Sequence, residues 1–72
     1  MSKIIVAPKR EFRNLVPINW QEEISKIKGV RVLVRDARQL RIEATPEAVR
    51  ELYSQLESKF NIEQTVVHYK MA

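Results

Sequence analysis

Two segments with helix-capping signals stand between four short apolar segments, and this order most constrains what the chain can fold into. The second segment has the clearer signals, because Thr45 can cap a helix and Pro46 occupies the first helical position, where no backbone N–H is needed. We predict that this helix ends at Asn61, a residue type that accepts a left-handed conformation. Apolar residues recur along it with the helical period, at Val49, Leu52, Tyr53, Leu56 and Phe60.

The first helix is predicted to begin after Asn19. Asn is a favoured N-cap residue, and Glu22 three positions later completes a capping-box pattern. Gly29 is the only glycine in the chain, and it stands where a residue with positive φ is favoured after a helix end. An apolar stripe runs along this helix, at Trp20, Ile24 and Ile27.

Four segments have the composition or the alternation of β-strands. The first covers residues 3–7, which are mostly β-branched, and the last covers residues 62–69. Residues 30–35 and 40–44 alternate between two faces, and residues 36–39 join them as a hairpin connection.

The alternation assigns the side chains of the two middle strands to opposite faces of a sheet. Those predicted to face a core are Val30, Val32, Val34, Leu40, Ile42 and Ala44. Those predicted to face away from it are Arg31, Leu33, Arg35, Arg41 and Glu43. The first and last strands fit either parity, so the direction of their side chains stays open.

This order of elements predicts a single α+β domain over residues 1–72. Right-handed crossovers lead to an antiparallel sheet with the strand order 4-1-3-2 and both helices on one face, which is the ferredoxin-like βαββαβ sandwich. A chain of 72 residues has room for one core between a sheet and one layer of helices. The other face of the sheet is therefore predicted to be uncovered.

The composition excludes several kinds of site. The chain has no cysteine, which excludes disulfides, thiolate metal sites and cysteine nucleophiles. His68 is the only histidine, so no second one can help it to hold a metal, and a single glycine cannot form a glycine-rich phosphate loop. We expect no enzymatic activity, no metal and no cofactor.

The same composition bears on location. A small domain without cysteine favours a cytoplasmic setting, whereas a secreted one is expected if the chain is a fragment of a precursor. The longest apolar runs are too short to span a bilayer, so we expect no membrane partner.

A net charge of +4 suits an acidic partner, either nucleic acid or protein. Lys9, Arg10 and Arg13 form a basic cluster in the connector over residues 9–18. The connector is expected either to lie in solvent, with Phe12 and Leu15 packed on the core, or to contact phosphates. A small basic nucleic-acid-associated domain is therefore one alternative.

The predicted uncovered face favours a protein partner. RNA-recognition domains of this fold stack bases on aromatic residues of the central strands, and residues 3–7 and 40–44 contain none. Arginine is enriched at protein interfaces. We therefore predict a docking face, and a homodimer that covers this face is a further alternative. Its residues are Arg31, Leu33, Arg35 and Arg41.

Four segments of the chain, KIIVAPK, EEISKIKGVRV, ATPEAVRELYSQLE and IEQTVVHYKMA, carry a resemblance to a known family. They resemble the inhibitor I9 family, which comprises the propeptides of subtilisin-like serine proteases and their stand-alone inhibitor relatives. The resemblance covers most of the chain. It implies a non-enzymatic protease inhibitor or intramolecular chaperone.

The resemblance also implies a binding mode. The uncovered sheet face would dock on two surface helices of the protease, and the segment after His68 would enter the substrate cleft like a cleaved product, with main-chain pairing supplying affinity. The cleft residues would be Tyr69, Lys70, Met71 and Ala72. The chain departs from the family in its last strand, where only Glu63 is acidic, and a basic face is unusual opposite helix N-termini, which prefer anions.

Overall fold

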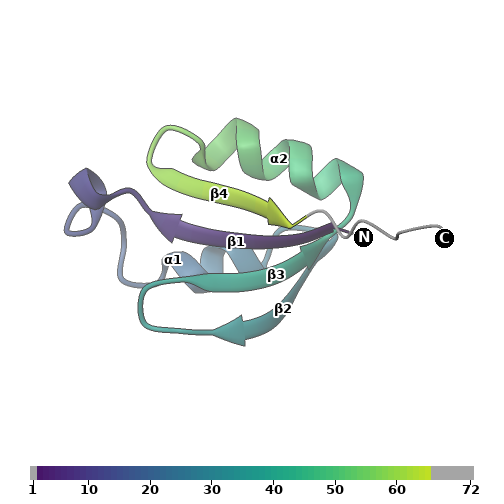
Figure 1. The fold of residues 1–72 in the computed structure, drawn as a ribbon, viewed down its shortest axis with the longest axis horizontal. Helices are drawn as coiled ribbons and strands as arrows, with labels where there is room; N and C mark the ends of the chain where they lie inside the picture. Colours follow the sequence, from purple (N-terminus) through teal and green to yellow (C-terminus); the bar gives the residue numbers. More distant parts are fainter. Residues whose placement is uncertain (1, 66–72) are drawn as a thin grey trace, which may run out of the picture.

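The computed structural model describes residues 2–65, which form a four-stranded antiparallel sheet with two helices on one face (Figure 1). The strand order is β2-β3-β1-β4, which is the predicted order read from the opposite edge, so the predicted ferredoxin-like arrangement is confirmed. The elements are β1 (Ser2–Pro8), the 3-10 turn η1 (Arg10–Phe12), α1 (Trp20–Ser25), β2 (Val30–Arg35), β3 (Leu40–Ala44), α2 (Pro46–Leu56) and β4 (Phe60–Thr65).

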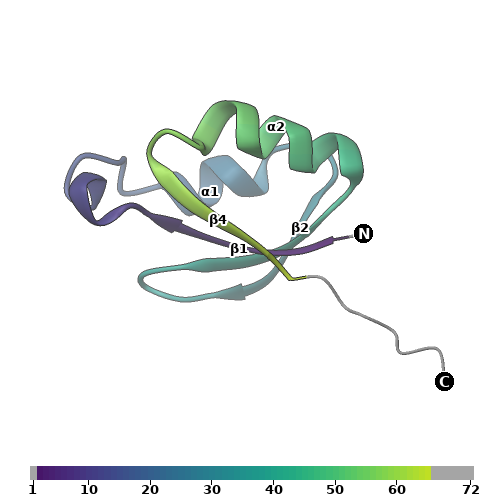
Figure 2. The ribbon, with the colours of Figure 1, turned by 45° about the horizontal axis from the view of Figure 1, so that its top comes forward.

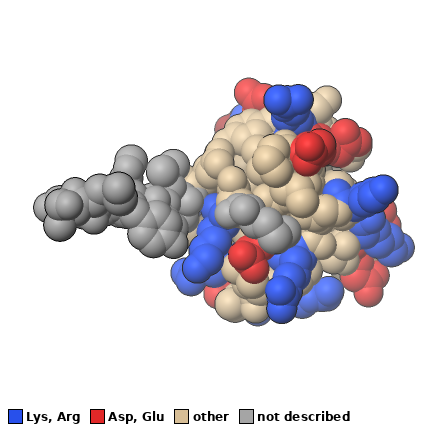
Figure 3. All heavy atoms as spheres, turned by 90° about the vertical axis from the view of Figure 1, so that its right-hand side faces the viewer, with Lys and Arg blue, Asp and Glu red and all other residues tan. Residues whose placement is uncertain are grey.

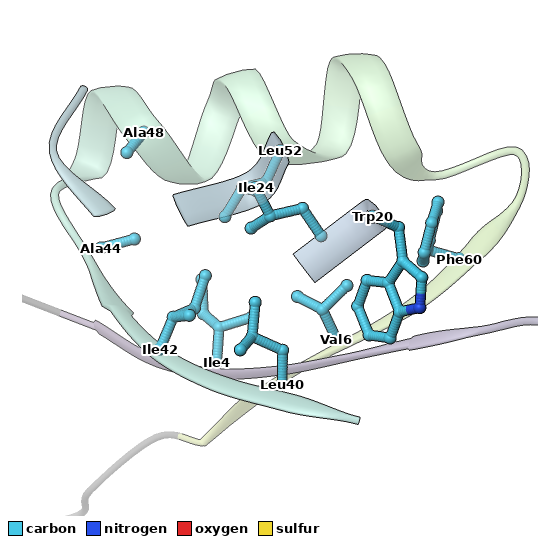
Figure 4. Packing of buried hydrophobic residues seen from close by; sticks show 10 residues of the cluster. All are labelled: Ile4, Val6, Trp20, Ile24, Leu40, Ile42, Ala44, Ala48, Leu52 and Phe60. Carbon is cyan, nitrogen blue, oxygen red and sulfur yellow. The ribbon is translucent and has the colours of Figure 1, made fainter. Parts of the chain in front are cut away.

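The core lies between the sheet and the two helices (Figure 4). The central strands β1 and β3 supply its floor, and their inward side chains are almost completely buried. At one end, the rings of Trp20 and Phe60 lie 5.4 Å apart in a tilted arrangement, which is favourable for an aromatic pair. The buried residues are Ile4, Val6, Trp20, Ile24, Leu40, Ile42, Ala44, Ala48, Leu52 and Phe60.

Helix α2 begins as its caps predict and ends earlier than its periodicity predicts. The hydroxyl of Thr45 accepts a hydrogen bond from the Ala48 N–H at 3.2 Å. The helix ends at Leu56, and Asn61 lies in β4 with a negative φ, so its predicted role as a left-handed helix end is wrong. Phe60 is buried, as its position in the periodic pattern suggested, but it reaches the core from the first position of β4.

Helix α1 is shorter than its stripe suggested. Asn19 is the N-cap residue, but its side chain makes no capping hydrogen bond, so the predicted capping box does not form. Its amide instead lies 3.4 Å from a carboxylate oxygen of Glu23. Trp20 and Ile24 are buried in the core, and Ile27 packs against it from the turn that follows the helix.

The connector between β1 and α1 packs on the core through a different residue than predicted. Phe12 is half-buried as expected, but the side chain of Leu15 is 72% exposed, and Val16 makes the contact with the core. In the turn after η1, the N–H groups of Leu15 and Val16 both donate to the carbonyl of Phe12.

Gly29 contacts the start of α2 from the turn that follows α1. It adopts a φ of 91°, which confirms the predicted positive φ. The carbonyl of Gly29 accepts a hydrogen bond from the Thr45 N–H at 3.1 Å, and a Cβ at Gly29 would lie 2.5 Å from the Thr45 hydroxyl oxygen. Because α1 ends at Ser25, Gly29 is not its C′ residue, and that prediction is wrong. Gly29 instead lies in the turn before β2 and packs directly on the cap of α2, where there is no room for a side chain.

We predict that Gly29→Ala lowers the free energy of unfolding by about 2 kcal/mol, because alanine is strained at positive φ and its methyl group would displace the α2 cap. Urea denaturation measures this change. Lys28→Ala, at the exposed neighbouring position, is the control and should leave stability nearly unchanged. Equal stability of the two variants would contradict the importance of this junction.

Candidate partner-binding face

The face of the sheet opposite the helices has no element of residues 2–65 over it (Figure 2). Ile4 and Val6 of β1 point into the core, so Lys3, Ile5 and Ala7 point the other way, and this settles the parity that the sequence left open. Ile5 pairs with Arg41 on one side and Glu63 on the other. We define the open face by Lys3, Ile5, Ala7, Arg31, Leu33, Val34, Arg41, Glu43, Asn61 and Glu63.

A β-bulge in β2 changes which side chains reach the open face. Val32 pairs with Ile42 and Val34 pairs with Arg41, so Leu33 is an extra residue without a partner on β3. Residues that lie opposite each other across an antiparallel pair share a face. Val34 therefore lies on the open face beside Arg41, and the prediction that it faces the core is wrong.

The same bulge removes Arg35 from the predicted docking face. Arg35 pairs with Leu40, whose side chain is buried under the helices, so Arg35 lies at the helix side of the sheet. There it lines a hollow together with Trp20 and Gln21 of α1. The other three predicted residues, Arg31, Leu33 and Arg41, lie on the open face.

The sequence contains an indication that one of the two middle strands has a bulge. A four-residue connection over residues 36–39 places Arg35 opposite Leu40, so the two must share a face, whereas regular alternation assigned Leu40 inward and Arg35 outward. These two assignments conflict unless one strand gains a residue. The side-chain pattern and the hairpin length together therefore required a bulge, although neither indicates its position.

Charges of both signs alternate on the open face. Arg31 pairs with Glu43, and Glu43 pairs with Lys3, so a negative side chain lies between two positive ones. Glu63 faces Arg41 across Ile5. The face thus carries three cations and two anions, and Figure 3, which looks at the end where β1 begins, shows red beside blue. The predicted basic face is nearly balanced in charge.

Aliphatic side chains lie among the charged ones on the open face. Leu33 and Val34 are on the edge strand β2, Ile5 is on the central strand β1, and Arg41 of β3 lies between Val34 and Ile5. Leu33 and Val34 are 41% and 51% exposed. They line a shallow hollow of about 290 Å³ together with Lys3, Ile5 and Arg41. The open face therefore has an aliphatic patch that adjoins charged side chains.

The basic cluster of the connector does not join the open face. Lys9 follows β1, and its N–H bonds to the carbonyl of Lys59 at 2.9 Å, which fixes the cluster beyond the end of the sheet. Arg10 and Arg13 are exposed there, on the turn of η1 and just after it. The connector and the β2–β3 hairpin lie at the same end of the molecule in Figure 1.

The predicted cleft segment lies outside the described residues. This applies to His68 and to Tyr69, Lys70, Met71 and Ala72. Within residues 2–65, no group of three or more His, Cys, Asp or Glu side chains is placed to hold a metal ion. In the same part of the chain, no helix has the length and apolar character needed to cross a membrane.

Comparisons with known proteins add no assignment: no family model, no curated protein and no solved structure matches this chain.

We predict that Asp substitutions at Val32 and Val34 differ sharply, although regular alternation would treat the two residues alike. Val32→Asp places a charge against the core and should lower the free energy of unfolding by about 3 kcal/mol. Val34→Asp places a carboxylate in solvent beside Arg41 and should change it by no more than about 0.5 kcal/mol. Urea titration of both variants is the measurement, and an equal loss would contradict the bulge.

Proposed function

We propose that this chain is a non-enzymatic protein-binding module that docks through its open face, and that its partner is a subtilisin-like serine protease, which it inhibits or helps to fold. The observation that carries the docking proposal is an uncovered sheet face with an exposed aliphatic patch. The resemblance to protease propeptides carries the identity of the partner.

The composition of the open face supports a protein partner. Specific protein interfaces have an apolar centre that excludes water and a polar border. Ile5, Leu33 and Val34 supply an aliphatic patch that a partner would cover, and Arg31 and Arg41 belong to the residue type enriched at interfaces. An aliphatic cluster left in water costs free energy, and burying it against a partner would recover that cost.

The charge pattern makes this face a poor nucleic-acid platform. Binding to a phosphate backbone depends on many cations that each release counterions. Here Glu43 and Glu63 lie among the three cations and would repel phosphates. No aromatic side chain lies on β1 or β3 to stack a base. The nucleic-acid alternative thus depends on Lys9, Arg10 and Arg13 at the end of the sheet.

The position of β4 is compatible with the proposed insertion of the C-terminal segment into the substrate cleft. β4 is an edge strand, paired only with β1 among the described strands, and the segment predicted to enter the cleft follows it in sequence. Docking of the open face would hold the start of that segment at one place on the protease. The segment would then bind as an added strand, with backbone hydrogen bonds supplying affinity and alternate side chains supplying specificity.

We predict that the full chain inhibits a subtilisin-like protease and that a chain ending at His68 does not. The shortened chain lacks the four residues proposed to occupy the cleft but keeps the whole described fold. Progress curves of peptide hydrolysis measure inhibition, and circular dichroism checks that both chains are folded. Absence of inhibition by the full chain at tens of micromolar, about the range of weak binding, would rule out this partner.

We also predict that Arg41→Glu weakens binding to the protease by roughly tenfold, since it reverses a charge that lies between Val34 and Ile5 of the aliphatic patch. Arg50→Glu makes the same change on the exposed side of α2 and should leave inhibition unchanged. An equal effect of both variants would show that only net charge matters and would contradict docking through the open face.

Stability that rises with protein concentration would instead favour the homodimer.

A further inference from the structure

A second surface feature lies at the end of the sheet, where the connector meets the β2–β3 hairpin. It is a hollow of about 200 Å³, and it shares no residue with the open face. Arg13 and Arg38 are far apart in the sequence, but both line this hollow, the first from the connector and the second from the hairpin. Its full lining is Pro8, Arg13, Asn14, Trp20, Ala37 and Arg38.

The charge of the hollow is uncompensated. Both arginines are exposed, and no acidic side chain is part of the lining. Within residues 2–65 the only salt bridge joins Lys26 and Glu23, so neither Arg13 nor Arg38 has an ion-pair partner there. Two like charges that share one hollow repel each other, and a bound anion would relieve this repulsion.

The hollow also offers neutral hydrogen-bond donors. Asn14 contributes an amide group from the connector. Figure 4 shows the six-membered ring of Trp20 toward Val6 and its indole nitrogen on the opposite side. Within residues 2–65 this nitrogen has no hydrogen-bond partner, and no buried side-chain nitrogen or oxygen lacks one, so the indole N–H is not completely buried. Trp20 lines both this hollow and the one beside Arg35.

We propose that this hollow binds a phosphate monoester group. A monoester phosphate carries a charge near −2 at neutral pH, which matches two guanidinium groups. Guanidinium forks pair with phosphate oxygens through two parallel hydrogen bonds, and the remaining oxygen can accept from the Asn14 amide or the Trp20 indole. The volume is large enough for one phosphate group with bound water.

The test uses the full chain and the signal of its single tryptophan. Inorganic phosphate is added while the Trp20 indole N–H resonance is followed by NMR, with sodium chloride at equal ionic strength as the reference. We expect a saturable shift with phosphate and none with chloride. The absence of a phosphate-specific shift, or a shift that grows without saturation, would overturn the site.

Matched variants connect the shift to the two arginines. Arg13→Gln with Arg38→Gln should weaken phosphate binding at least about tenfold, because hydrogen bonds to charged groups are strong enough for such an effect. Lys28→Gln with Arg50→Gln removes two exposed cations outside the hollow and should leave the binding curve unchanged. Equal weakening in both variants would mean only a diffuse charge effect and would overturn the site.

Two further ligands test the preference for a monoester. Phosphoserine carries a terminal phosphate, whereas dimethyl phosphate has the single charge of a nucleic-acid backbone unit. Stronger binding of phosphoserine supports the proposal. Equal or stronger binding of dimethyl phosphate would overturn the monoester assignment and would favour a polynucleotide at the connector. None of these outcomes depends on protease inhibition, so the two proposals fail or hold separately.

Discussion

The structure depends on burial at one face of its two central strands. Ile4 and Val6 of β1 lie beside Leu40 and Ile42 of β3, and each of these side chains is almost completely removed from water. Apolar burial is the main favourable term in folding, so both helices must lie on this face. No helix or strand of residues 2–65 covers the opposite face. The open face is thus a consequence of how the core is built.

The bulge at Leu33 determines the character of the open face. Without the bulge, Val34 would face the core and Arg35 would join the other arginines, which would make a more basic surface. With it, Leu33 and Val34 both reach solvent near Ile5, and Arg35 moves to the helix side. The single extra residue therefore places the aliphatic Val34 on the open face and removes the cation Arg35 from it. Bulges often serve to redirect side chains in this way.

Local signals in the sequence were sufficient to predict features that depend on one residue or on one strand. The cap of Thr45, the positive φ of Gly29 and the alternation of β3 followed from such signals. Predictions failed where contacts between distant parts of the chain determine the structure. Phe60 continues the helical period, but it is the first residue of β4 and packs on Trp20. Val16, and not Leu15, packs against the core. The meeting of Arg13 and Arg38 depends on how the connector and the hairpin sit together, which no local pattern encodes.

The most direct test of this account measures which methyl groups meet solvent. A soluble paramagnetic probe should broaden the NMR signals of the Leu33 and Val34 methyl groups strongly in the dilute free protein, while the Val32 methyl groups, packed against the core, should be affected far less. Adding the binding partner should then protect Leu33 and Val34. Protection of Val34 equal to that of Val32 in the free protein would contradict both the bulge and the open face.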